Sequence, residues 1–168
     1  DSQKTEDIVS LINSLNEDCY IDGIMVDRPL PKKYDENKII NSITSNKDVD
    51  GYTFLNLGGL VSNQDCLLSC TPLAAMRLVQ FYNIDLTGKD VLVIGRSVNV
   101  GKPLSLMLLN KNATVTISHS KTVNLKEKCK KADIIFLALG KANFLKKESF
   151  SPLKYPASCP RITSGAFL

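Results

Sequence analysis

Apolar residues near the start of the chain recur with the period of a helix. After Thr5 they stand at intervals of three and four positions, at Ile8, Leu11, Ile12 and Leu15. Side chains at this spacing share one face of a helix, and the Thr5 hydroxyl can accept a hydrogen bond from the first turn. The pattern predicts an amphipathic helix that Thr5 caps and that keeps one solvated face.

The segments that follow predict a strand, a second helix and a third helix. The apolar run at 21–26 is typical of a buried strand, which Pro29 and Pro31 end. Residues 35–43 predict another amphipathic helix, followed by an acidic turn at 48–51 and a loop at the glycines 58 and 59. Thr71 caps a further helix that Pro72 starts and that runs to residue 82.

From residue 89 onward, short apolar runs alternate with helical patterns. The predicted order is a strand at 90–94, a helix at 102–109, a strand at 113–118, a helix at 124–131 and a strand at 133–139. Strands that are joined through helices by short connections form right-handed crossovers and a parallel sheet. The predicted fold class is α/β: a Rossmann-like parallel sheet with helices on both faces, preceded by part of a smaller α/β domain.

These patterns divide the chain into three regions. Residues 1–68 form part of the smaller domain, and residues 69–150 form part of the Rossmann-like domain. Residues 151–168 contain three prolines, three serines and no acidic residue, although 17 acidic residues precede them. Because no strand or helix period is visible there, we interpret this tail as disordered, truncated or out of frame.

Composition and charge narrow the class of protein. With 43% hydrophobic and 23% charged residues the chain is typical of globular proteins. Its net charge of +4 comes from 21 basic and 17 acidic residues that are spread along the sequence, which gives no support to nucleic-acid binding but is compatible with small anionic ligands. No apolar run approaches the length of a membrane span, and no secretory signal opens the chain.

Cysteine and histidine usage restricts the chemistry further. The five cysteines are an odd number and form no C-x-x-C pair, which argues against a secreted disulfide framework and favours a reducing compartment, the cytoplasm. His119 is the single histidine, so a site with several histidine ligands is excluded and we predict no metal. One imidazole without a partner supports no nucleophilic mechanism, so we assign His119 to structure or cofactor packing.

A glycine turn stands between the strand at 90–94 and the helix that follows it. Gly95, Ser97 and Gly101 form G-x-S-x-x-x-G, where dinucleotide-binding turns usually have G-x-G-x-x-G. Such a turn brings unpaired backbone N–H groups and a helix dipole against a phosphate. Arg96 can pair with an additional phosphate, as NADP requires. The alternative is that the glycines only let a strand turn into a helix.

Six ordered blocks along the chain carry a resemblance to a known family. They are Asp22-Gly23-Ile24-Met25-Val26-x-x-Pro29-Leu30-Pro31, Lys47-Asp48-Val49-Asp50-Gly51, Cys70-Thr71-Pro72, Gly95-Arg96-Ser97-x-x-Val100-Gly101-x-Pro103, Asn112-Ala113-Thr114-Val115-Thr116 and His119-Ser120-x-Thr122. Across residues 5–150 the chain resembles the bifunctional methylenetetrahydrofolate dehydrogenase/cyclohydrolase family. So many blocks in the same order make an accidental match very improbable.

The resemblance implies a two-domain enzyme of folate one-carbon metabolism, with residues 1–68 on the folate side and residues 69–150 on the NAD(P) side of a cleft. Members of the family transfer a hydride from 5,10-methylenetetrahydrofolate to a nicotinamide cofactor, which gives 5,10-methenyltetrahydrofolate. Water then opens this product to 10-formyltetrahydrofolate. The resemblance further implies a homodimer.

The resemblance also assigns the cofactor contacts. They fall on Gly95, Arg96, Ser97, Gly101 and Ser120. A guanidinium and a hydroxyl suit a 2′-phosphate, so Arg96 and Ser120 favour NADP, although some relatives with a similar arginine use NAD.

On the folate side the resemblance assigns the substrate contacts. Asp50 matches the family aspartate that holds the pterin ring, because a carboxylate can accept hydrogen bonds from the ring's amino group and nitrogen. Val26, Asp27 and Arg28 match the segment that lines the substrate pocket. The alternative for Asp50 is a turn aspartate that bonds its own backbone.

Asp27 departs from the family, which usually has glutamine at this position beside its catalytic lysine. A carboxylate there would stabilise the charged ammonium and raise the pKa of the lysine, and a protonated lysine is a poorer base. We therefore predict a dehydrogenase with weakened cyclohydrolase activity. The alternative is that Asp27 only bonds a neighbouring backbone group.

The resemblance places the family's catalytic lysine, in a Y-x-x-x-K motif, upstream of the region that matches Asp1, so no residue of this chain is assigned to it. The family's C-terminal glycine-rich segment has no match in the chain either. We expect the chain to be the central part of the enzyme, so its own activity stays open. One alternative is another Rossmann-type dehydrogenase, which would need neither the D-V-D-G nor the V-x-x-P-L-P block. The other is a catalytically inactive chain that binds nucleotide.

Overall fold

The computed structural model describes residues 3–140 and 144–145, and the chain forms two compact units that divide between Ala74 and Ala75. We call the part up to Ala74 unit 1 and the part from Ala75 onward unit 2. The division falls inside helix α4 (Cys70–Phe81). The predicted tail at 151–168 lies outside the described residues, and the domain boundary predicted between residues 68 and 69 stays a prediction.

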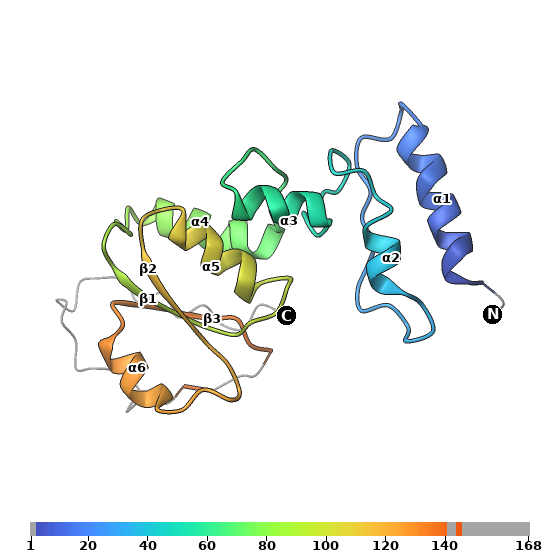
Figure 1. Cartoon of the computed structure of the whole chain (residues 1–168). Coiled ribbons are helices and arrows are strands. Elements are labelled where there is room, and N and C mark those ends of the chain that lie inside the picture. Colours follow the sequence, from blue (N-terminus) through green and yellow to red (C-terminus); the bar gives the residue numbers. More distant parts are fainter. Residues whose placement is uncertain (1–2, 141–143, 146–168) are drawn as a thin grey trace. The chain divides into compact units, whose positions relative to one another are not determined.

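The described part of unit 2 contains a three-stranded parallel sheet with β1 (Asp90–Ile94) at its centre. β1 pairs with β2 (Thr114–Ser118) on one side and with β3 (Ile134–Leu137) on the other. Helix α5 (Gly101–Leu109) leads from β1 to β2, and α6 (Leu125–Lys131) leads from β2 to β3 (Figure 1). The predicted order of strands and helices is confirmed, and only the last strand is clearly shorter than predicted.

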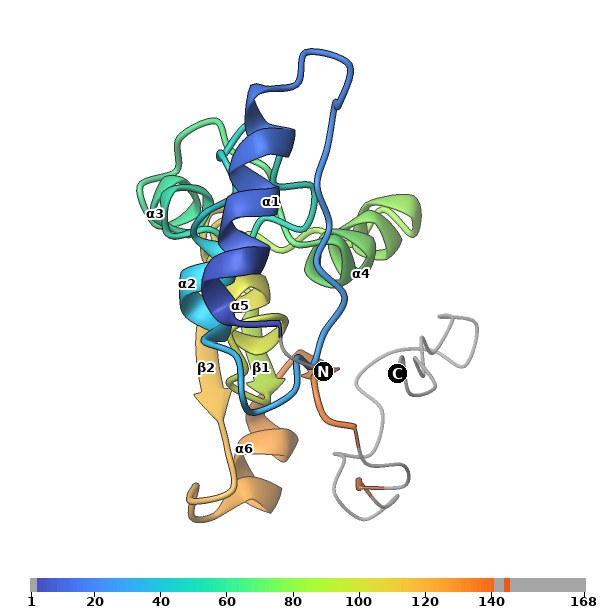
Figure 2. The same cartoon turned by 90° about the vertical axis from the view of Figure 1, so that its right-hand side faces the viewer.

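Successive side chains of β1 pack into two different layers. Val91 and Val93 belong to a cluster with residues of α4 and α5, whereas Leu92 and Ile94 pack with Cys129 of α6. All four β1 side chains are at most 2% exposed, and burying an aliphatic side chain of this size contributes about 1.5 to 3 kcal/mol. The alternation of a strand therefore confirms helices on both faces of the sheet, and Figure 2 shows α5 and α6 on opposite sides of it.

Unit 1 has its apolar core between α1 (Thr5–Glu17) and α2 (Glu36–Ile40). Ile12 of α1 and Ile39 of α2 pack together with Ile43, which lies just beyond α2. The two helices lie side by side in both views (Figures 1 and 2). The helical spacing predicted for both segments is confirmed, although α2 ends before residue 43.

The start of α1 differs from the prediction, because Thr5 is its first residue and not its cap. Lys4 is the N-cap, and the Asp7 carboxylate accepts its backbone N–H at 2.8 Å. The Thr5 hydroxyl oxygen instead accepts the backbone N–H of Asp35 at 3.0 Å. Asp35 in turn caps α2 by accepting the N–H of Lys38 at 3.0 Å. The threonine therefore ties the starts of two helices together.

The strand predicted at 21–26 is wrong. This segment makes a single parallel bridge, between Ile24 and Asp48, in which the Ile24 N–H donates to the Lys47 carbonyl at 2.7 Å. Ile24 is buried, but the neighbouring Met25 is 68% exposed. A run of apolar residues builds a strand only where neighbouring strands take up its backbone groups, and this segment has one such contact.

The loop predicted at the glycines 58 and 59 is also wrong, because these residues lie in a helix, α3 (Phe54–Val61). Thr53 caps α3 by accepting the N–H of Asn56 at 3.4 Å, and Asn56 and Leu60 are buried. A side chain on Gly59 would meet the Cβ of Cys66 at 2.8 Å, so the glycine allows a close approach of the following segment. Tertiary contacts here override the low helix propensity of glycine.

Helix α4 was predicted to start at Thr71 and Pro72, and it begins one residue earlier, at Cys70. Thr71 is therefore inside the first turn and not the cap. Pro72 still lies in that first turn, where its missing N–H leaves no helical hydrogen bond unmade. The helix ends at Phe81, next to the predicted end.

Candidate functional site

The glycine turn after β1 is fixed by contacts between backbone atoms. The Gly95 N–H donates to the Ser118 carbonyl of β2 at 2.8 Å, and its φ of 134° is a value that side chains disfavour. A Cβ on Gly95 would collide with the carbonyl oxygen of Ala138, which follows β3, and would meet its carbonyl carbon at 2.9 Å. The turn is therefore held between the ends of the two outer strands.

Gly101 brings the start of α5 onto the same turn. A Cβ on this residue would meet the carbonyl carbon of Gly95 at 2.6 Å and the nitrogen of Arg96 at 2.8 Å. The first and last glycines of G-x-S-x-x-x-G thus serve the tight turn and the close packing of helix on turn that a dinucleotide fold requires.

Ser97 forms hydrogen bonds within the turn itself. Its hydroxyl oxygen accepts the N–H groups of Val100 at 3.2 Å and Gly101 at 3.3 Å, and its carbonyl accepts the N–H of Lys102 at 3.0 Å. These three N–H groups at the start of α5 are therefore paired within the turn, which the sequence pattern did not predict. A hydroxyl that accepts in this way can still donate its own hydrogen to a phosphate oxygen.

Two exposed side chains lie in loops that follow β1 and β2. Arg96 comes directly after Gly95, and Ser120 lies in a turn closed by His119 and Thr122. In that turn the Thr122 N–H donates to the His119 carbonyl at 2.8 Å, and the His119 N–H donates to the Thr122 hydroxyl at 2.8 Å. His119 Nδ1 accepts the N–H of Lys121 at 3.2 Å, so the imidazole has a local structural contact. Ligands of parallel sheets bind at this carboxyl end of the strands.

In unit 1, Asp48 holds the predicted acidic turn. This carboxylate is 1% exposed, and one oxygen accepts the Thr53 N–H at 2.8 Å and the Asn56 side-chain amide at 2.9 Å. Its backbone carbonyl accepts the Gly51 N–H at 3.1 Å, which closes the turn around Asp50. Sequence reasoning assigned no role to Asp48, Thr53 or Asn56, although an aspartate five residues before a threonine at a helix start is a usable signal.

Asp50 is half-buried at the tip of this turn. Burial raises the pKa of its carboxyl, the negative charge of Asp48 raises it further, and the guanidinium of Arg28 opposes both effects. Tyr52 follows two residues later, and burial together with Asp50 raises the pKa of its phenol. The turn therefore presents a carboxylate whose charge depends on its neighbours, as functional carboxylates often do.

The segment at 26–28 contributes three different side chains to unit 1. Val26 packs against the apolar core, and Asp27 is exposed, with one carboxylate oxygen accepting the N–H of Arg28 at 3.0 Å. Arg28 forms an ion pair with Glu36 of α2, and its guanidinium carbon lies 5.0 Å from the centre of the Tyr52 ring. Sequence reasoning missed Glu36 and Tyr52, which are both far from Arg28 along the chain.

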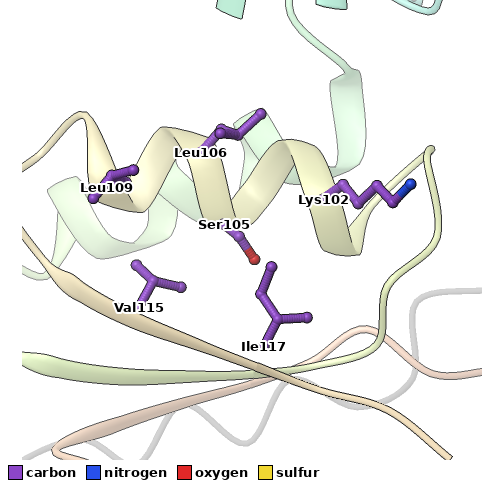
Figure 3. A pocket seen from close by; sticks show the side chains of 6 residues that line it. All are labelled: Lys102, Ser105, Leu106, Leu109, Val115 and Ile117. Atoms are coloured by element: carbon purple, nitrogen blue, oxygen red, sulfur yellow. The ribbon is translucent and has the colours of Figure 1, made fainter. Parts of the chain in front are cut away.

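A cavity of about 340 Å³ lies between α5 and β2, and its lining includes none of the residues predicted for the site. Its lining is mostly apolar and consists of Lys102, Ser105, Leu106, Leu109, Val115 and Ile117 (Figure 3). The Ser105 hydroxyl donates to the Gly101 carbonyl at 2.7 Å inside α5. Such a lining offers few polar groups to a charged cofactor.

The part of the chain that the structure describes has neither a metal-binding cluster nor a membrane span. Among residues 3–140 and 144–145, no three His, Cys, Asp or Glu side chains come together as a metal-binding group. Within the same ranges, each helix is too short or too polar to cross a lipid bilayer.

Family models match both halves of the chain. Residues 1–50 match the catalytic domain of the tetrahydrofolate dehydrogenase/cyclohydrolase family, and residues 69–154 match its NAD(P)-binding domain. The chain is 54% identical over 141 residues to the bifunctional protein FolD of Campylobacter hominis. The aligned residues make up 84% of this chain and 50% of that protein. The chain thus spans about half the length of the curated relatives that it matches.

Solved structures give the same result. The bifunctional FolD methylenetetrahydrofolate dehydrogenase/cyclohydrolase of Campylobacter jejuni has a TM-score of 0.87 at 41% identity, covering 89% of this chain and 53% of that one. The Trypanosoma brucei methylenetetrahydrofolate dehydrogenase-cyclohydrolase, solved with NADP and an inhibitor, has a TM-score of 0.83 at 28% identity, covering 89% and 52%. With the glycine turn and the acidic turn both in place, the chain belongs to the tetrahydrofolate dehydrogenase/cyclohydrolase family.

Proposed function

We propose that this chain carries the cofactor and folate contacts of an NADP-dependent methylenetetrahydrofolate dehydrogenase in folate one-carbon metabolism. The reaction oxidises 5,10-methylenetetrahydrofolate to 5,10-methenyltetrahydrofolate. The observation that carries the proposal is the turn from Gly95 to Gly101, whose backbone packing leaves no room for a side chain at either glycine. The names of the relatives in Campylobacter and Trypanosoma support the same reaction.

The residues of unit 2 fit a dinucleotide with an additional phosphate. Gly95 and Gly101 keep the turn compact, Ser97 orders its backbone, and the exposed Arg96 and Ser120 can pair with the 2′-phosphate of NADP. NADP supplies a nicotinamide ring that accepts the hydride. NAD lacks the 2′-phosphate, so it is the alternative cofactor if Arg96 makes no such contact.

On the folate side we assign Asp50 to the pterin ring and the segment Val26, Asp27 and Arg28 to the wall of the substrate pocket. An ionised carboxylate at Asp50 can accept hydrogen bonds from two neighbouring N–H donors of the ring. The turn that Asp48 holds keeps this carboxylate at its tip. Orientation of the substrate is the role that these residues supply, because a positioned carbon donor is what hydride transfer needs.

We further propose that Asp27 weakens the hydrolysis of the methenyl product to 10-formyltetrahydrofolate. One oxygen of Asp27 accepts the Arg28 N–H, which supports its alternative role as a local backbone contact. The other oxygen can stabilise the ammonium of a neighbouring lysine. Asp27→Gln in the complete gene product should raise the rate of methenyltetrahydrofolate hydrolysis and leave hydride transfer unchanged, and an equal hydrolysis rate in both proteins would exclude the role.

The cofactor assignment is tested by binding. Thermal unfolding with increasing NADP or NAD should give a melting temperature that rises with ligand concentration, and more steeply for NADP. Arg96→Gln should weaken NADP binding by about tenfold to a hundredfold, since it removes a charge-assisted contact, and should leave NAD binding unchanged. Arg77→Gln is the matched control, because Arg77 is exposed on α4 and bonds Gln80 at 3.1 Å.

Three outcomes of this experiment separate the hypotheses. Equal affinity for NADP and NAD in both variants would remove the 2′-phosphate role of Arg96. Stabilisation by NADP without turnover of 5,10-methylenetetrahydrofolate would favour a chain that binds nucleotide and catalyses nothing. No stabilisation by either cofactor would contradict the whole assignment of the glycine turn.

We also propose that the complete protein is a homodimer in the cytoplasm. The resemblance implies the dimer, and the odd number of cysteines favours a reducing compartment. Light scattering during gel filtration measures the mass of the assembly, and cell fractionation measures the location. A monomeric mass at micromolar concentration would contradict the first part.

A further inference from the structure

Arg28 is held from two sides inside unit 1. Glu36 of α2 forms an ion pair with its guanidinium, and the same glutamate accepts the Leu30 N–H at 3.4 Å. The ring of Tyr52 lies under the guanidinium at 5.0 Å, within the range of a cation–π contact. The Arg28 side chain is only 22% exposed. A guanidinium with two anchors keeps one position, unlike an arginine that extends into solvent.

These anchors place the positive charge beside the turn that carries Asp50. Asp48 lies two residues before Asp50, and Tyr52 lies two residues after it. Because the guanidinium contacts Tyr52, the positive charge lies beside a turn that carries two carboxylates. The titratable groups around Asp50 are Asp48 and Tyr52 of the same turn, Arg28 with its partner Glu36, and Cys70 at the start of α4, which acts on Tyr52. Among these groups Arg28 carries the positive charge.

We propose that Arg28 is a positioning residue that acts through Asp50: its guanidinium, anchored by Glu36 and Tyr52 beside the turn, keeps the Asp50 carboxylate ionised, so that it can accept two hydrogen bonds from a pterin ring. The inference rests on the proposed function, in which Asp50 holds that ring. A protonated carboxyl presents one O–H donor and cannot accept from both N–H groups of the pterin. Arg28 therefore acts through Asp50, without a contact of its own to the reacting carbon.

The electrostatics of the turn agree with this role. Burial and the charge of Asp48 both raise the pKa of Asp50, and Arg28 lowers it. Without the guanidinium, Asp50 would become protonated at a higher pH. The guanidinium beside the turn therefore favours the charged form of Asp50, against burial and the charge of Asp48.

The experiment compares Arg28→Gln with Arg28→Lys in the full chain. The glutamine keeps a donor for Glu36 and removes the charge, whereas the lysine keeps the charge. Carbon-13 NMR of labelled aspartate measures the Asp50 pKa directly, with Asp50→Asn identifying the signal. Equilibrium dialysis measures tetrahydrofolate binding at pH 5 and pH 8. Lys32→Gln is the matched control, because Lys32 is an exposed cation in the same segment.

We expect Arg28→Gln to raise the Asp50 pKa by about one pH unit, and to weaken tetrahydrofolate binding more at pH 5 than at pH 8, by at most about tenfold, because a shift of one pH unit changes the ionised fraction by no more than that. Arg28→Lys should restore most of both values, and Lys32→Gln should match the unmodified chain. In an Asp50→Asn background the substitution of Arg28 should no longer change the pH dependence. If Arg28→Gln does not fold, Arg28→Met with the same two measurements replaces it.

The two measurements separate the inference from the function on which it rests. A raised Asp50 pKa without any binding of tetrahydrofolate would support the electrostatic role of Arg28 and contradict the proposed folate site. Binding of tetrahydrofolate with an Asp50 pKa that is equal in all variants would overturn the role of Arg28 and leave the folate site in place. An equal effect of Lys32→Gln would show a general charge effect and would also overturn it.

Discussion

The turn at Gly95 and the turn at Asp50 both present candidate site residues, but they are built in opposite ways. In unit 2, backbone packs on backbone, so that a Cβ on Gly95 or Gly101 has no space. In unit 1, a buried side chain does the work, because the Asp48 carboxylate accepts hydrogen bonds from Thr53 and Asn56. One turn depends on the absence of side chains and the other on the presence of one.

This difference determines which substitutions each turn tolerates. At Gly95 the chemistry of an added side chain is irrelevant, since the first carbon already collides with Ala138. At Asp48 the shape can be kept while the acceptor is lost, which leaves buried donors without a partner. Steric substitutions should therefore disrupt the turn at Gly95, and isosteric changes of hydrogen bonding should disrupt the turn at Asp50.

The largest effect is expected for Gly95→Ala. The added Cβ meets backbone atoms of Ala138 that cannot rotate away, and the φ of 134° is strained for alanine. We expect the free energy of unfolding to fall by about 3 kcal/mol, measured by urea denaturation. Gly140→Ala is the control, because a Cβ there meets nothing within 4 Å. Equal stability of the two variants would show that steric packing at Gly95 does not hold this turn.

Asp48→Ala is expected to have the next largest effect. It removes the acceptor of the Thr53 N–H and the Asn56 amide, and two buried donors without partners destabilise the fold by about 2 kcal/mol. Thermal unfolding of unit 1, followed by the chemical shifts of α3, measures the loss. Asp48→Asn keeps an oxygen that can accept and should lose less. If alanine and asparagine behave alike, hydrogen bonding does not hold the turn.

Lys47→Met tests the contact that connects the turn at Asp50 to α1. The Lys47 ammonium donates to the carbonyls of Leu15, Asn16 and Asp18 at 3.0, 2.7 and 2.8 Å, where the helix leaves its last carbonyls unpaired. We expect a loss of about 1 kcal/mol in unfolding free energy. Lys38→Met is the control, since its ammonium pairs with the exposed Glu6. A smaller loss at position 47 than at position 38 would contradict the capping role.

The smallest effect concerns the pH dependence that Asp50 adds to stability. Because its pKa is raised in the folded chain, the folded state binds more protons than the unfolded state between the two pKa values. Its contribution is therefore fully present below the unfolded pKa and is lost as the pH rises through the folded pKa. The change in unfolding free energy that Asp50→Asn causes should therefore be more favourable to the folded state at pH 7 than at pH 3. The opposite sign in calorimetry would show that the folded turn favours the charged carboxyl.

Residues of unit 2 were more predictable from sequence than those of unit 1. The strand at Val91 is an apolar run, the strand at Val115 alternates apolar and polar residues, and α5 is largely apolar, as one sheet with two helical layers explains. The strand at residues 21–26 failed because Ile24 makes one bridge, and α3 was missed because the contacts of Thr53 and Gly59 lie outside any local pattern. Periodicity reports burial, but it does not report which partner causes it.

The candidate site followed the same rule. The glycines at 95 and 101 are recognisable from their place between a strand and a helix, although their spacing is not the usual one, because their role is steric and local. The anchors of Arg28 are 8 and 24 residues away from it, and neither Glu36 nor Tyr52 carries a signal that names the arginine as a partner. The hydrogen bonds of Ser97 to the start of α5 also had no counterpart in the glycine pattern.

Ser97 pairs N–H groups at the start of α5, and the exposed Arg96 is the cation of this turn that we propose for the 2′-phosphate of NADP. Attraction between exposed charges is screened by dissolved ions over a Debye length of about 10 Å at 0.1 M salt. NADP binding should therefore weaken with ionic strength more steeply than NAD binding. The ratio of NADP affinity to NAD affinity should therefore depend on the salt concentration as well as on the protein, and it should fall as salt is added.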